Sequence, residues 1–166
     1  MEAQQTGGGG RVRRVGGDED AGAAAALLDR FNREYETPTP GSEFLARRIE
    51  ELDGDQFAVY LAREEDEDVG VGVIRFRPAI WSDGLEGYIA ELYVIGDHRE
   101  RGLGGELLEA MLARARELGC DWVELGTDEN DSDAHRLYER FGFSNFVNRG
   151  APADERERML VYEREL

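Results

Sequence analysis

A glycine-rich stretch in the middle of the chain has the composition of an anion-binding loop. It reads Arg99-Glu100-Arg101-Gly102-Leu103-Gly104-Gly105 and lies between an apolar run and a segment with helical periodicity. Glycines at a helix start let the backbone approach a ligand, and the first amide groups of a helix have no acceptor within it. Because the helix dipole also favours negative charge there, the stretch predicts a phosphate or pyrophosphate site. A glycine-rich turn without a ligand is the alternative.

Two common nucleotide-binding motifs do not fit this stretch. The Rossmann pattern needs a third glycine where Leu107 stands, and the P-loop ends in Gly-Lys-Ser/Thr. The chain has no lysine, since all 20 of its basic residues are arginine. Both motifs are therefore disfavoured.

Three side chains are candidates to move protons near such a site. Glu91 is the single charge in the apolar run at residues 88–95, and burying a carboxylate without a purpose is costly. It could act as a base through a water or hold a substrate ammonium by charge, and a paired structural glutamate is the alternative. Glu86 is a second candidate base or a turn residue. Tyr138 lies on the apolar stripe of a later helix, which by itself favours a core aromatic.

The elements that must position these residues mix helices and strands. The hydrophobic periodicity predicts helices at residues 18–35, 42–54, 103–118 and 131–141, and strands at residues 11–15, 57–62, 70–76, 88–95, 121–125, 145–148 and 159–163. The continuous apolar run at residues 88–95 indicates a central strand buried on both faces. Residues 1–10 are polar, end in four glycines and are expected to form a flexible leader, with a single domain over residues 11–166.

Composition and net charge indicate which classes of molecule the chain could bind. The chain has 166 residues, 40% of them hydrophobic, and a formal net charge of −17. Such acidity disfavours nucleic acid and favours small cationic molecules. We expect no membrane segment, because no apolar run approaches the roughly 18 residues of a spanning helix. A single cysteine, Cys120, fits a reducing compartment, so a soluble cytoplasmic protein is expected, and His98 and His135 lack metal-ligand spacing.

Two blocks of the sequence resemble the GNAT superfamily of N-acetyltransferases. Leu92-Tyr93-Val94 followed by Arg99-x-x-Gly102-x-Gly104 is similar to the family's fourth strand and acetyl-CoA loop. A second block is similar to its Asn-x3-Ala-x2-Leu-Tyr-x3-Gly-Phe pattern through Asn130, Ala134, Leu137, Tyr138, Gly142 and Phe143. Gly96 stands where proline is common and Glu100 where glycine is common. The close resemblance spans residues 86–143, and residues 77–81 with 88–94 are loosely similar to the polyamine and small-amine branch.

The resemblance implies an α/β (α+β) GNAT fold, with a mixed, mostly antiparallel sheet of about six or seven strands flanked by about four helices. It implies acetyl-CoA as the acetyl donor. The backbone of residues 92–94 would pair with the pantetheine arm, the Val94 N–H would polarise the thioester carbonyl, and the amides of residues 101–105 would bind the pyrophosphate. The implied cofactor-binding residues are Leu92, Tyr93, Val94, Arg99, Glu100, Arg101, Gly102, Leu103, Gly104, Gly105, Asn130 and Ala134.

The expected activity is therefore transfer of an acetyl group from acetyl-CoA to a primary amine of a small cationic substrate, by direct attack and without a metal. By resemblance Tyr138 holds the position of the acid that faces the CoA thiolate, and Glu91 is the favoured base. One alternative is acetylation of protein N-termini or side-chain amines, and another is a catalytically silent acyl-CoA-binding module. Members of the family are often dimers, so a homodimer is expected.

Overall fold

The computed structural model describes residues 10–147, 150–161 and 163–165. The expected leader therefore lies outside the described residues, except for Gly10. The chain divides into two compact units, Met1–Leu125 and Gly126–Leu166. The expectation of a single domain over residues 11–166 stays a prediction.

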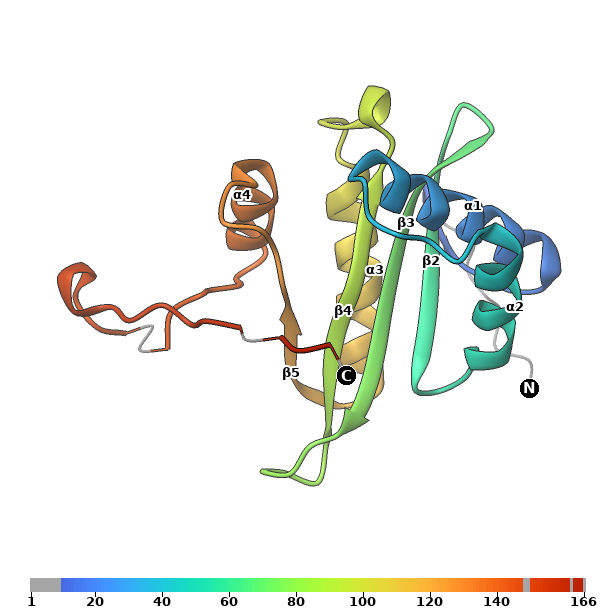
Figure 1. Cartoon of the computed structure of the whole chain (residues 1–166). Coiled ribbons are helices and arrows are strands. Elements are labelled where there is room, and N and C mark those ends of the chain that lie inside the picture. Colours follow the sequence, from blue (N-terminus) through green and yellow to red (C-terminus); the bar gives the residue numbers. More distant parts are fainter. Residues whose placement is uncertain (1–9, 148–149, 162, 166) are drawn as a thin grey trace. The chain divides into compact units, whose positions relative to one another are not determined.

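The first unit is built on a five-stranded sheet whose strands follow chain order (Figure 1). They are β1 (Val12–Arg14), β2 (Phe57–Glu64), β3 (Glu67–Pro78), β4 (Leu85–Val94) and β5 (Cys120–Leu125). Neighbouring strands are antiparallel except β4 and β5, which are parallel. A parallel pair needs a crossover, and helix α3 (Leu103–Glu117) supplies it. The glycine-rich stretch is consequently the turn from β4 into this helix.

Helices cover both faces of this sheet (Figure 1). Helix α1 (Asp18–Glu34) contributes four buried side chains to a core that includes Val71, Val73 and Tyr93 of the sheet, and helix α2 (Ser42–Leu52) adds Ile49. Side chains alternate across a strand, so Gly70 and Gly72 face the other side, where α3 packs. A Cβ on Gly72 would lie 2.9 Å from Met111 Cε, so the absence of a side chain there lets α3 approach the sheet closely.

The second unit contains helix α4 (Ser132–Arg140) and a short 3-10 turn, Ala153–Glu155. Asp131 caps α4, because its Oδ1 accepts a hydrogen bond of 3.0 Å from the Ala134 N–H. Among the described residues, the strands expected at 145–148 and 159–163 do not form; a single antiparallel bridge joins Phe146 to Arg158. Asn148 and Tyr162 lie outside the described part of the chain.

Exposure explains why the last two expected strands do not form. Val147 is 66% exposed and Val161 is 78% exposed, so the described part of the chain does not bury these two side chains. A strand is stabilised largely by packing of its side chains on a pleated, half-buried surface. The sheet accordingly has five strands, fewer than the six or seven expected, while all four expected helices are present.

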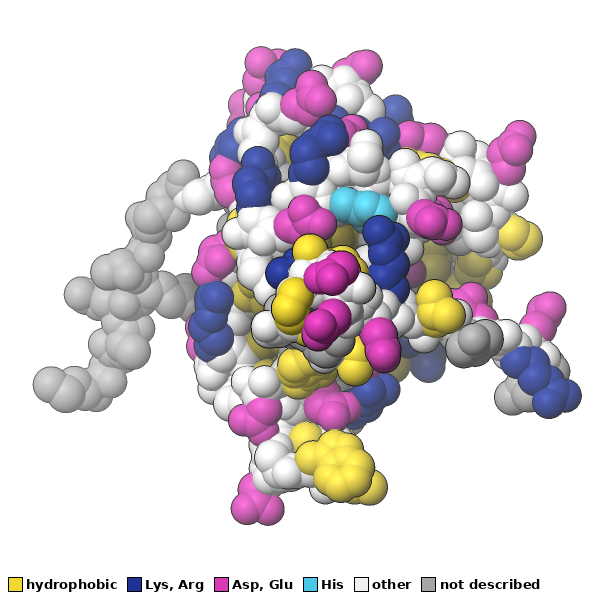
Figure 2. Space-filling model, turned by 90° about the vertical axis from the view of Figure 1, so that its left-hand side faces the viewer, with side chains coloured by type: hydrophobic (Ala, Val, Ile, Leu, Met, Phe, Trp, Pro, Cys, Tyr) yellow, Lys and Arg dark blue, Asp and Glu magenta, His cyan; other side chains and the backbone are white. Residues whose placement is uncertain are grey.

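The surface carries both signs of charge. Figure 2 shows acidic and arginine side chains interspersed over the face that it presents. Many of them pair; Arg13, for example, bonds Asp20 at 2.8 Å and Asp68 at 2.6 Å. Within the part of the chain that is described, no helix is both long and apolar enough to span a bilayer.

Candidate functional site

Strand β4 is longer than its pairing with β5. Its residues Leu85–Ile89 pair with β5, which ends at Leu125, whereas β3 stays paired with β4 as far as Val94. The register between β3 and β4 shifts at Ala90, next to the point where β5 ends. Among the described residues of the first unit, none forms a strand beside residues 90–94 on the side away from β3. This five-residue stretch is here called the open edge.

The register decides which backbone groups face the open edge. The Ile95 N–H donates a 2.9 Å hydrogen bond to the Val69 carbonyl, so the backbone groups of residues 91 and 93, two and four positions earlier, are also directed to β3. Leu92 and Val94 alternate with them and direct theirs to the open edge. Three residues were expected to pair with pantetheine. The backbone N–H groups of Leu92 and Val94 face the open edge, whereas the backbone groups of Tyr93 face β3 within the sheet.

The Tyr93 side chain is part of the core instead. It stacks on Phe31 with ring centroids 4.8 Å apart, and its hydroxyl donates to Glu34 Oε2 at 2.5 Å. Burial, helped by Glu34, raises the pKa of Tyr93 to about 12. Glu34 also accepts from Arg99 Nη2 at 2.9 Å, while Arg99 Nε donates to the Val94 carbonyl at 2.8 Å. The Arg99 side chain thus lies at the Val94 end of the open edge, where it bonds the last carbonyl group of the strand.

The loop after β4 presents backbone amides, as the sequence predicts. A 3-10 turn, Gly96–His98, precedes two left-handed residues, Glu100 with a φ of 63° and Gly102 with a φ of 86°. Left-handed backbone is uncommon outside glycine, so Glu100 adopts a conformation that its side chain disfavours. Helix α3 begins at Leu103, and its first internal backbone bond runs from the Glu106 N–H to the Gly102 carbonyl at 3.0 Å. The amides of residues 103–105 therefore have no acceptor within the helix.

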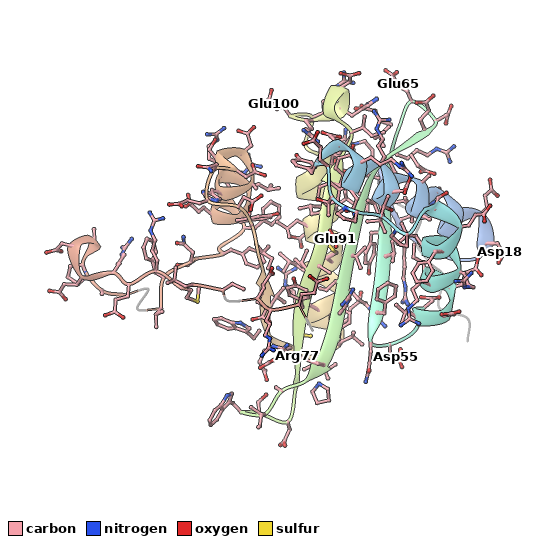
Figure 3. All side chains as sticks on the ribbon, in the orientation of Figure 1. Asp18, Asp55, Glu65, Arg77, Glu91 and Glu100 are labelled. Atoms are coloured by element: carbon pink, nitrogen blue, oxygen red, sulfur yellow. The ribbon has the colours of Figure 1, made fainter. Side chains whose placement is uncertain are left out.

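Glu91 is half-buried on β4 (Figure 3). The register is regular between Glu91 and Tyr93, so both side chains lie on the face that α1 covers. Among the described residues, none forms a hydrogen bond or ion pair with its carboxylate. Burial raises the pKa of Glu91, and the charge of Arg75 offsets part of that rise. A carboxylate in this state accepts a proton more readily than an exposed one.

Glu86, the second candidate base, is engaged in an ion pair. Its Oε2 accepts a hydrogen bond of 2.8 Å from Arg77 Nε, and Arg77 also bonds Glu124 at 3.0 Å. Figure 3 labels Arg77 near the other end of the sheet from Glu100. Glu86 is therefore a paired carboxylate, whereas no described residue pairs with Glu91.

The remaining residues that the resemblance implies for the site, Asn130, Ala134 and Tyr138, lie in the second unit. Asn130 precedes α4 and is exposed, and its carbonyl accepts from the Ser132 N–H at 3.0 Å. Tyr138 is half-buried, with its ring centroid 6.1 Å from that of Phe143. Burial raises the pKa of Tyr138 to about 12, so its phenol keeps its proton at neutral pH. That is the protonation state that a proton donor requires.

Neither histidine lies in a cluster of metal ligands. His98 bonds Glu64 through Nδ1, and His135 Nε2 lies 2.8 Å from the Asp128 carbonyl. The described residues contain no group of three or more His, Cys, Asp or Glu side chains placed to hold a metal ion.

A comparison of the whole sequence with known protein families agrees with the geometry of β4, the glycine-rich loop and α3. The sequence profile of the acetyltransferase (GNAT) family matches residues 24–143, which is most of the chain. The chain belongs to the GNAT acetyltransferase family. The GNAT fold expected from the sequence is thereby confirmed. The matched range includes the open edge, the glycine-rich loop and α4.

Individual GNAT relatives show how far this similarity extends. A mycothiol acetyltransferase of Thermobispora bispora is 34% identical over 143 residues, covering 82% of this chain and 47% of that protein. The chain thus spans about half the length of that relative. An N-alpha-acetyltransferase of Arabidopsis thaliana, MAK3, is 36% identical over 73 residues, 44% of this chain and 38% of that protein. A crystal structure of an Arthrobacter sp. FB24 protein assigned as an acetyltransferase is 36% identical, with a TM-score of 0.80 and full coverage of both chains.

Three residues that contact the site were not expected from the sequence. Arg11 and Glu64 bond the loop residues, and Glu34 bonds Tyr93 and Arg99. Each lies in a charge-rich segment, where nothing in its type or spacing distinguishes it from its neighbours. Only the folded arrangement reveals them.

Proposed function

We propose that this protein transfers an acetyl group from acetyl-CoA to a primary amine of a small cationic molecule. The observation that carries the proposal is the continuity of the open edge with the start of α3. The backbone groups of Leu92 and the N–H of Val94 face the open edge and suit the amides of a pantetheine arm, while the Val94 carbonyl accepts from Arg99. The amides of residues 103–105 follow at one end and suit its pyrophosphate. The residues present therefore fit acetyl-CoA.

Each bond change in the proposed reaction has a candidate group. The amine nitrogen bonds to the acetyl carbon as the carbon–sulfur bond breaks, so the amine must lose a proton and the leaving thiolate must gain one. Glu91 takes the amine proton, directly or through a water, and Tyr138 donates a proton to the thiolate. The Val94 N–H stabilises the negative charge that develops on the carbonyl oxygen. Asn130 and Ala134 are proposed to complete the binding of acetyl-CoA.

The preference for a small cationic acceptor rests on charge. The chain has a net charge of −17, and Glu91 is a half-buried carboxylate with no paired cation in the described structure. Both features attract an ammonium group. Acetylation of protein N-termini is the second candidate, supported by the similarity to the Arabidopsis N-alpha-acetyltransferase over 73 residues. A homodimer and a cytoplasmic location stay predictions; Cys120 is a free thiol.

Thiol release with a panel of amines tests the proposed function. We expect acetyl-CoA to be consumed with polyamines or aminoglycosides at a rate well above that with peptides, because compact cations match the acidic surface. The measurement is the appearance of free CoA thiol at matched amine concentrations. Turnover on peptide N-termini alone would support the second candidate. CoA binding without turnover on any amine would identify a silent acyl-CoA-binding module.

A Glu91→Gln variant is expected to turn over about 10²–10⁴-fold more slowly at neutral pH, the usual contribution of a general base. Wild-type turnover should fall at low pH as Glu91 becomes protonated, and the variant should lose this acidic limb. Calorimetry should show CoA binding close to that of the wild type. A pH–rate profile identical to that of the wild type would leave Glu91 a structural role only.

The same variant has a predictable effect on stability. Because burial raises the pKa of Glu91 in the folded state, ionisation of this group opposes folding, and its stabilising protonated form is lost as the pH rises through the folded pKa. Glutamine carries no such cost. The variant should melt above the wild type at neutral pH, and the difference should shrink below the ordinary glutamate pKa of about 4.3.

A further inference from the structure

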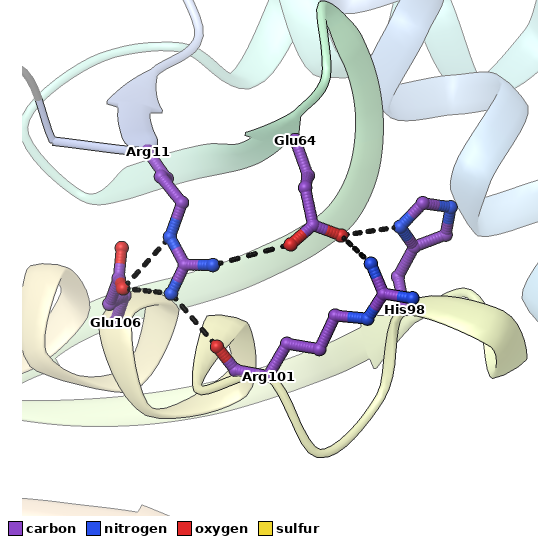
Figure 4. A network of polar contacts seen from close by, with 5 residues as sticks. All are labelled: Arg11, Glu64, His98, Arg101 and Glu106. Atoms are coloured by element: carbon purple, nitrogen blue, oxygen red, sulfur yellow. Dashed lines mark hydrogen bonds and ion pairs between the residues drawn. The ribbon is translucent and has the colours of Figure 1, made fainter.

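A network of five polar side chains surrounds the glycine-rich loop from outside (Figure 4). Three of them belong to the loop or its borders: His98, Arg101 and Glu106. The other two come from distant parts of the chain, namely Arg11, just before β1, and Glu64, the last residue of β2. None of the proposed catalytic steps uses this network.

Glu64 is the centre of the network. Its Oε2 lies 2.6 Å from His98 Nδ1 and 3.0 Å from Arg101 Nη1, and its Oε1 lies 3.5 Å from Arg11 Nη1. The Glu64 side chain is only 15% exposed, and hydrogen bonding to His98 lowers its pKa. One ionised carboxylate therefore joins β2 to both sides of the loop.

Arg11 controls the orientation of a single peptide group. Its Nη2 donates a 2.9 Å hydrogen bond to the Arg101 carbonyl, and its guanidinium also bonds Glu106 in the first turn of α3. A trans peptide group is planar, with its carbonyl and N–H pointing in opposite directions. Holding the Arg101 carbonyl toward Arg11 therefore directs the Gly102 N–H away from the network, to the side where an anion can accept it.

We infer that Glu64 and Arg11 are positioning residues that hold the loop in its anion-binding conformation before acetyl-CoA arrives. The inference rests on the proposed function for the identity of the anion. The charges of Arg11 and Arg101 are balanced by those of Glu64 and Glu106, so the network adds little net attraction for pyrophosphate. The network instead keeps the loop rigid before binding, which lowers the conformational entropy that the loop loses when the ligand binds.

Two variants separate positioning from simple charge attraction. Glu64→Gln removes a negative charge beside the anion site, so electrostatics alone would strengthen CoA binding, whereas loss of positioning would weaken it. Arg11→Lys keeps the charge but replaces a planar fork of donors by a single ammonium group, which cannot reproduce the same set of bonds. Glu109→Gln is the matched control, because Glu109 lies on α3 outside the network and pairs with Arg116.

The experiment combines calorimetry with CoA and hydrogen exchange of the unliganded protein. We expect Glu64→Gln and Arg11→Lys to raise the Kd for CoA about tenfold or more, as for the loss of hydrogen bonds to charged groups. The amides of residues 99–106 should exchange faster, while those of β3 and β4 keep the wild-type rate and show that the sheet is intact. Glu109→Gln should change neither quantity.

Unchanged exchange of the loop in both variants would overturn the inference, as would tighter CoA binding by Glu64→Gln. If the wild-type protein bound no CoA, the proposed function would fail. Loop exchange would still decide whether Glu64 and Arg11 hold the loop. The two failures are therefore distinguishable.

Discussion

A Tyr138→Phe variant is expected to lose about 10²–10⁴-fold in turnover while keeping its melting temperature close to that of the wild type. The change removes the phenolic hydroxyl, and with it the proton donor, but retains the ring that lies near Phe143. The phenol is protonated throughout the neutral range, as an unperturbed tyrosine is, and burial raises its pKa to about 12 and makes it a weaker acid, so its proton has to move as the carbon–sulfur bond breaks. Turnover at saturating acetyl-CoA and thermal melting are the two measurements.

Tyr35→Phe is a suitable control for this prediction. Tyr35 is 54% exposed at the end of α1, so the same loss of a hydroxyl should affect neither turnover nor melting. A fall in rate of less than about threefold in the Tyr138 variant, far below the range typical of general acids, would remove Tyr138 from the mechanism. A clear drop in melting temperature with little kinetic change would instead identify a core aromatic whose hydroxyl is bonded.

A Gly104→Val variant is expected to weaken CoA binding by about 100-fold or more. Gly104 lies in the first turn of α3, where the backbone amides must come within hydrogen-bond distance of the pyrophosphate. A branched side chain there displaces the anion, and a shift of about 1 Å in such a site can cost about 100-fold. Gly104 has helical backbone and is not among the residues with a positive φ, so its backbone conformation does not require glycine.

Gly22→Val provides the matched control. Gly22 is also helical, and nothing lies within 4 Å of the Cβ that it would carry. Calorimetry with CoA should show wild-type affinity for this control and a collapse for the Gly104 variant, with similar circular dichroism in both. Equal affinities in the two variants would place the pyrophosphate away from the start of α3.

Local pattern was sufficient to predict the parts of the site that adjoin one another in sequence. The helix start at Leu103 follows from glycine placement and periodicity. The open edge could not be predicted, because it depends on where β5 stops relative to β4. The exposed C-terminal segment was expected to pair as strands, since alternation of residue types does not show whether a neighbouring strand exists.

The loop network illustrates a second limit. Arg11 bonds Glu64 across 53 residues and Glu106 across 95 residues, and all three are ordinary members of charged segments. Partner choice among 20 arginines and 37 acidic residues is set by the tertiary structure. Sequence reasoning can therefore find groups that bind a ligand through a motif, but not the ion pairs that hold the motif in place.

The open edge also has a consequence for self-association. An unpaired strand edge is a template for pairing with another copy of the chain, which is a common route to aggregation. Here the template is short: only Leu92 and Val94 direct backbone groups outward, and Arg99 already occupies the Val94 carbonyl. A strand from a second copy of the chain would form too few backbone hydrogen bonds here to offset its loss of conformational entropy. The open edge can thus remain accessible to an extended ligand without promoting the growth of an intermolecular sheet.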